Sequence, residues 1–102
     1  MGLSTKIANL LSGISDPTTR IDIASTINYL FSIYSSGKAN ENEIRDALYE
    51  ILTDVLRATH PELVEEEIKK KARTLVEDLM QSFRMESAVK RTISKFGGRL
   101  GI

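Results

Sequence analysis

The stretch from residue 61 to residue 84 constrains the fold more than any other part of the sequence. After Pro61 it contains no proline and no glycine. A helix over about 61–84 would be about 35 Å long, so other helices must pack along it. Its apolar residues recur at steps of three or four, which is the spacing that lines one face of an α-helix and predicts a core stripe: Val64, Ile68, Ala72, Leu75, Leu79 and Phe83.

Two shorter helices are predicted at the N-terminal end of the chain. The first covers residues 3–13, where Gly13 is placed to end the helix in a left-handed cap. The second begins after Asp16, whose carboxylate can accept from the first free N–H groups, with a proline at the first helical position. We expect this helix to end at Gly37, because glycine adopts the left-handed geometry of a C-terminal cap without steric cost.

A third helix is predicted over residues 41–58. Asn40 is followed three residues later by Glu43, the pattern of a capping box at a helix N-terminus. The next segment, Thr59-His60-Pro61, then ends this helix and starts the long one, with Thr59 or His60 as the N-cap. The third helix carries a regular seam of apolar side chains, which we expect to face the core: Ile44, Leu48, Ile51, Val55 and Ala58.

After Phe83 the apolar residues fall out of step with the long helix. We interpret this phase change as a kink or short break at residues 84–87, followed by a final helix to Phe96 that folds back on the bundle. The alternative is a straight helix that leaves the final apolar side exposed; we favour the kink because monomeric proteins rarely expose such a patch. The apolar residues in question are Met85, Val89, Ile93 (or Thr92) and Phe96.

These patterns predict an all-α, single-domain bundle of four to five helices with short loops and one long helix. A chain of 102 residues is the length of one domain, and no stretch shows the alternation of a β-strand. We expect residues 1–96 to form the bundle. Gly97 and Gly98 should end the last helix, so that residues 97–102 form a flexible C-terminal tail.

Charge is divided unevenly along a chain whose formal net charge is zero. Residues 39–83 hold eleven acidic and six basic side chains, a net charge of −5, whereas residues 84–102 hold five basic and one acidic, a net charge of +4. Such a division bears on where a partner binds rather than on the fold.

Nothing in the sequence indicates a catalytic, cofactor-binding or metal site. There is no cysteine, which excludes thiol catalysis, disulfides and thiolate ligands. The single histidine, His60, stands beside a proline and is interpreted as a helix-boundary residue. The run Glu65-Glu66-Glu67 cannot converge on one ion, because consecutive helical residues point about 100° apart. We therefore expect a protein that is not an enzyme and needs no cofactor.

The basic C-terminal segment is the one feature with functional content. Lys90, Arg91, Lys95 and Arg99 border an amphipathic helix and are the candidate contacts for a partner or nucleic acid. Our first hypothesis is a cytoplasmic helical protein–protein interaction or scaffold module, with a protein partner or self-association. The alternative is weak nucleic-acid binding through residues 84–99. No apolar run is long enough to span a membrane.

Overall fold

The structure is a computed structural model that describes the backbone of residues 2–100 and the side chains of residues 2–90. The described residues form no strand, so the predicted all-α class with one long helix is confirmed. Within the described backbone, four helices follow one another in the order α1 (Leu3–Leu11), α2 (Pro17–Ser35), α3 (Glu41–Thr59) and α4 (Glu65–Leu100).

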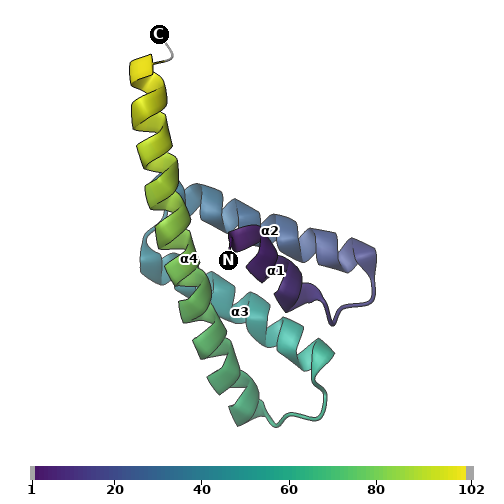
Figure 1. Cartoon of the computed structure of the whole chain (residues 1–102). Helices are drawn as coiled ribbons and strands as arrows, with labels where there is room; N and C mark the ends of the chain where they lie inside the picture. Colours follow the sequence, from purple (N-terminus) through teal and green to yellow (C-terminus); the bar gives the residue numbers. More distant parts are fainter. Residues whose placement is uncertain (1, 101–102) are drawn as a thin grey trace.

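The three shorter helices pack along the N-terminal half of α4, and the C-terminal part of α4 extends beyond all of them (Figure 1). The most extensive contact is between α3 and α4. A helix of 36 residues is about 54 Å long. The longest dimension of the molecule is 55 Å, against 28 and 22 Å for the other two. Helix α4 therefore sets the length of the molecule.

The two predicted N-terminal caps are confirmed. The backbone N–H of Thr19 donates to the Asp16 carboxylate at 3.3 Å, and Pro17 is the first residue of α2. At the start of α3 the N–H of Glu43 donates to the Asn40 side chain at 2.9 Å, while the Glu43 carboxylate accepts from the Asn40 N–H at 3.2 Å. These short-range bonds satisfy N–H groups that the first turn of a helix leaves free.

The two glycines predicted as helix stops behave differently. Gly37 has a φ of +76°, and the N–H of Lys38 bonds to the carbonyl of Ile33 at 2.9 Å, which completes a left-handed cap. The prediction for Gly13 is wrong, because Gly37 is the only positive-φ residue among those described. A Cβ at Gly13 would lie 3.2 Å from the methyl group of Thr59, so the position instead allows α1 to approach the end of α3.

Helix α4 begins four residues later than the sequence predicts. Residues 61–63 form a turn in which the N–H of Leu63 donates to the carbonyl of His60 at 3.1 Å. His60 is the C-cap of α3, so neither Thr59 nor His60 caps α4. Pro61 lies in this turn, and its ring disfavours helical geometry at His60, where α3 ends.

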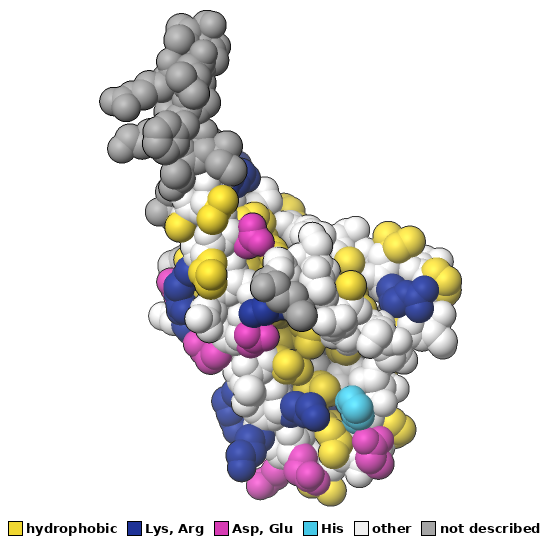
Figure 2. Space-filling model, in the orientation of Figure 1, with side chains coloured by type: hydrophobic (Ala, Val, Ile, Leu, Met, Phe, Trp, Pro, Cys, Tyr) yellow, Lys and Arg dark blue, Asp and Glu magenta, His cyan; other side chains and the backbone are white. Residues whose placement is uncertain are grey.

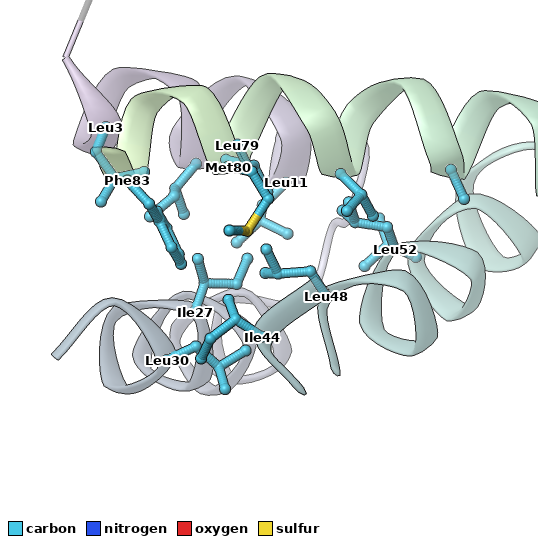
Figure 3. Close-up of a cluster of buried hydrophobic side chains, with 14 of the residues drawn as sticks. Leu3, Leu11, Ile27, Leu30, Ile44, Leu48, Leu52, Leu79, Met80 and Phe83 are labelled. Atoms are coloured by element: carbon cyan, nitrogen blue, oxygen red, sulfur yellow. The ribbon is translucent and has the colours of Figure 1, made fainter. Parts of the chain in front are cut away.

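All four helices contribute to one hydrophobic core (Figure 3). Phe83 of α4 is fully buried, and its ring meets Phe31 in an edge-on arrangement at 5.3 Å and Tyr34 at 5.9 Å. Both partners lie on α2, so this aromatic cluster joins α2 to α4. The other buried apolar residues are Leu3, Ile7 and Leu11 of α1, Ile27 and Leu30 of α2, Ile44, Leu48, Leu52, Val55 and Leu56 of α3, and Ile68, Ala72, Val76, Leu79 and Met80 of α4.

The predicted stripe of α4 is confirmed at four of its six positions, and two positions differ. Val64 is 60% exposed because it precedes the helix, and Leu75 is only partly buried. Val76 and Met80, which the stripe omitted, are buried. A helix that packs against several neighbours buries a wider face than a single seam requires, and α4 contacts α1, α2 and α3.

Candidate interaction surface on helix α4

Helix α4 is not broken at residues 84–87. It continues as one helix through this segment to Leu100, so the predicted kink and the folded-back final helix are both wrong. The segment has no proline or glycine, and the usual causes of a sharp kink are therefore missing from its sequence. The prediction that Gly97 and Gly98 end the last helix is also wrong, because α4 continues through both to Leu100. Each glycine disfavours a helix by only about 1 kcal/mol. Flexibility of residues 97–102 remains a prediction.

The inward side of α4 keeps its contacts with the bundle for about two turns beyond Phe83. Ser87, one turn later, is 1% exposed. The Glu86 carboxylate accepts from the backbone N–H of Leu3 at 3.2 Å. The Lys90 ammonium group lies 5.9 Å from the centre of the Phe31 ring, in cation–π geometry. The change of apolar phase therefore marks the end of the bundle rather than a bend in the helix.

Met85 and Val89 project from another side of the same helix segment. They are 63% and 54% exposed, which places them among the most exposed large apolar residues described. Figure 2 shows hydrophobic side chains on the part of α4 that leaves the bundle. Beside them is a hollow of about 270 Å³, lined also by Lys6, Gln81, Ser82 and Glu86. Met85 and Val89 are called the α4 apolar face below.

Of the four predicted contact residues, the structure describes the side chain of Lys90 alone. Lys90 is exposed and already lies over the ring of Phe31. Arg91, Lys95 and Arg99 belong to α4, but their side chains lie outside the described residues. In the sequence, the spacing of the α4 apolar face continues at Thr92 and Phe96, whose side chains also lie outside the described residues.

Four charged side chains tie α3 to α4 immediately before the apolar face. Arg84 donates to the Glu41 carboxylate at 2.6 and 3.2 Å, and Arg45 donates to Glu77 at 2.6 and 3.2 Å. Glu41 also lies 3.7 Å from Arg45, which joins the two pairs into one network. Bidentate arginine–carboxylate pairs fix orientation as well as distance. This α3–α4 ion-pair network therefore holds α4 at the base of its projecting segment.

The ion-pair network lowers the pKa of both of its carboxylates. The hydrogen bond from Arg84 holds the pKa of Glu41 below its ordinary value, and the hydrogen bond from Arg45 does the same to the pKa of Glu77. Both carboxylates thus stay charged in the folded chain at a pH where the unfolded chain binds a proton. Their contribution to stability is present above their ordinary pKa and is lost as the pH falls through the lowered value.

We expect the unfolding free energy of the double variant Glu41→Gln/Glu77→Gln to depend less on pH, in acidic buffer, than that of the wild type. The wild-type chain should lose more unfolding free energy than the variant between mildly acidic and strongly acidic buffer, because only the wild type must protonate the paired carboxylates. Urea unfolding at several pH values measures this. Glu66→Gln, at an exposed position in the first turn of α4, is the control. Equal pH slopes for wild type and double variant would contradict the role of the network.

Glu86 acts as the N-terminal cap of α1, although it lies 83 residues away from Leu3. The residue at the N-cap position is Gly2, which has no side chain to cap the helix. A second tie to the same helix comes from the Lys6 ammonium group, which lies 2.8 Å from Asp78 of α4. Both contacts join α1 to α4, and neither leaves a local pattern in the sequence.

Removing the Glu86 carboxylate should loosen α1. Glu86→Ala is expected to cost about 0.5–2 kcal/mol, the usual effect of losing an N-cap side chain. Amide exchange at residues 6–8 should accelerate, whereas exchange in the centre of α3 should change only with global stability. Glu86→Gln keeps an acceptor oxygen and should retain most of the protection. Unchanged exchange in α1 of the alanine variant would rule out the cap.

His60 and the first residue of the acidic run, Glu65, each have a structural partner. His60 Nδ1 lies 3.1 Å from Glu62, and Glu65 pairs with Arg57 across the α3–α4 turn. Among the described residues, no group of three or more His, Cys, Asp or Glu side chains is placed to hold a metal ion. Within the same residues, none of the helices combines the length and apolar character that crossing a bilayer requires.

Comparison with known proteins gives no family assignment. No protein-family model matches the sequence, and searches against curated proteins and against solved structures found no match.

Proposed function

We propose that this chain is a non-enzymatic protein–protein interaction module and that the α4 apolar face binds an α-helix of the partner. The observation that carries the proposal is the exposure of Met85 and Val89, at 63% and 54%, on a helix that continues beyond the bundle. Exposed apolar surface bordered by polar groups is typical of a binding site. A helical partner fits because its apolar side chains can pack between those of another helix.

The contacts that α4 makes with α1 and α3 near the apolar face support this proposal. The α3–α4 ion-pair network contacts the helix from one side, and the Glu86 cap and the Lys6–Asp78 pair join it to α1, at or just before the apolar face. A surface that is already ordered binds with a smaller loss of conformational entropy than a flexible one. A cytoplasmic location is part of the same proposal and is compatible with a chain that contains no cysteine.

Binding partners can be tested by photocrosslinking. A photoreactive phenylalanine analogue at position 85 should capture specific proteins in extracts of the source cells. Val89→Glu in the same chain should abolish that capture, because it places a charge in the apolar contact. Ile21→Glu, a change at an apolar residue of α2 that is 64% exposed, should leave capture intact. An identical set of captured proteins with and without Val89→Glu would contradict the proposal.

Weak nucleic-acid binding through residues 84–99 is the second candidate, because residues 84–102 carry a net charge of +4. Two of the basic residues are less available for phosphates, since Arg84 is paired with Glu41 and Lys90 lies over Phe31. Titration with duplex and single-stranded oligonucleotides at increasing salt separates the candidates. Affinity that falls steeply with salt would support nucleic-acid binding, whereas the interaction module predicts no saturable binding at physiological salt.

A further inference from the structure

Four residues that line the hollow beside the α4 apolar face have the spacing of a coiled-coil hole, with Lys6 of α1 at one side and Ser82 buried at its base. The four are Ser82, Met85, Glu86 and Val89, at positions i, i+3, i+4 and i+7 of one helix. In knobs-into-holes packing, four residues at this spacing surround one side chain of the facing helix. The volume of about 270 Å³ leaves room for a side chain to enter. A side chain from a helix that lies along the exposed side of α4, over Met85 and Val89, could therefore enter the hollow.

The same segment also carries the side chains that would fill such a hole. Met85 and Val89 are exposed, and the sequence continues their spacing at Thr92 and Phe96 in steps of four, three and four. Steps of this kind are those of the apolar seam in a coiled coil. A surface with both knobs and a hole is complementary to itself, which is the requirement for a two-fold symmetric contact between identical chains.

Charge determines how two such helices would run. A parallel pair places the basic segment 91–99 of one copy against the same segment of the other. An antiparallel pair centred between residues 85 and 89 instead places that segment beside Glu77 and Asp78 of the second copy. Both carboxylates already have a partner in their own copy, Glu77 in Arg45 and Asp78 in Lys6, so the basic segment would join two exposed ion pairs. The antiparallel pair thus avoids placing one basic segment against another. The formal net charge of the whole chain is zero, so two copies have no net long-range repulsion.

We infer that the occupant of the α4 apolar face is a second copy of this chain, bound through an antiparallel α4–α4 contact. This inference rests on the proposed function and names the partner. In the pair, Met85 of each copy packs beside Val89 of the other, and the Ser82–Val89 hole of each copy accepts a side chain from the facing helix. The residues past the bundle then gain a packing partner without any change in the rest of the fold.

Sedimentation velocity of the full chain tests self-association. The wild type should shift from monomer to dimer between micromolar and millimolar concentration. Val89→Glu and Met85→Glu should each weaken the dimer by about tenfold or more, as expected for central contacts of an interface. Ile21→Glu should dimerise like the wild type. Circular dichroism before each run confirms that the variants are folded. A wild-type chain that stays monomeric throughout overturns the inference.

Cysteine crosslinking tests the direction of the pair, since the natural chain has no cysteine to interfere. An equimolar mixture of Met85→Cys and Val89→Cys chains should form the mixed disulfide faster than either chain forms its own. Faster self-crosslinking of both single variants would indicate a parallel pair and overturn the antiparallel arrangement. A monomeric wild type combined with Val89-dependent capture of other proteins would overturn only this inference and leave the proposed function standing.

Discussion

Replacing Phe83 with alanine is expected to lower the free energy of unfolding by about 3–5 kcal/mol. Phe83 is 0% exposed, and its ring contacts Phe31 and Tyr34 of α2. Loss of the ring removes buried apolar surface, leaves a cavity and ends both aromatic contacts. Urea unfolding of the variant, followed by circular dichroism, measures the loss.

Two controls separate burial from aromatic character. Phe83→Leu retains most of the buried volume and should cost less than the alanine variant. Tyr29→Ala removes an aromatic ring that is 63% exposed on α2 and should change stability only slightly. A cost below about 1 kcal/mol for Phe83→Ala would place Phe83 outside the core and contradict the packing of α2 on α4.

Leu79→Ala is expected to cost about 2–5 kcal/mol, and Leu75→Ala clearly less. The two leucines are one turn apart on α4, so the change in helix propensity is the same. They differ in burial, because Leu79 is 1% exposed whereas Leu75 is only partly buried at the edge of the core. Since the side chains removed are identical, the difference between the two losses of unfolding free energy reflects the difference in burial.

Parallel denaturant titrations of the two variants determine the buried face of α4. The sequence stripe assigned Leu75 to the core and omitted Val76 and Met80, whereas the structure buries both omitted residues. An equal or larger loss for Leu75→Ala than for Leu79→Ala would mean that α4 is rotated about its axis, and the exposure of Met85 would then need revision.

The features that the sequence predicted correctly are those that act over a few residues. The Asp16 cap, the Asn40–Glu43 capping box and the left-handed Gly37 each depend on hydrogen bonds within one helical turn. A local pattern can identify such signals, although the equally local signals at Gly13 and at Thr59-His60-Pro61 were interpreted wrongly. The all-α class followed from the same kind of information, since apolar spacing defines a helical face without knowledge of what covers it.

The ion pairs and the α1 cap that the sequence did not predict depend on contacts between distant residues. Arg84 and Glu41 are 43 positions apart, and Glu86 and Leu3 are 83 apart, so no short pattern relates them. The phase change after Phe83 had two interpretations: either the helix bends there, or the helices that pack against it end there. Only the three-dimensional arrangement distinguishes them, because periodicity records which side is apolar and not where the bundle stops.

The course of α4 through residues 84–87 is the central claim, and a distance between two spin labels tests it most directly. Labels at Lys71→Cys and Thr92→Cys are 21 positions apart, which in one uninterrupted helix corresponds to about 32 Å along the axis. Pulsed electron spin resonance measures this distance, and excess unlabelled chain removes distances between copies. We expect a single narrow distribution near that value. A distribution centred below about 20 Å, as a helix folded back at residues 84–87 requires, would contradict the projecting helix and the surface built on it.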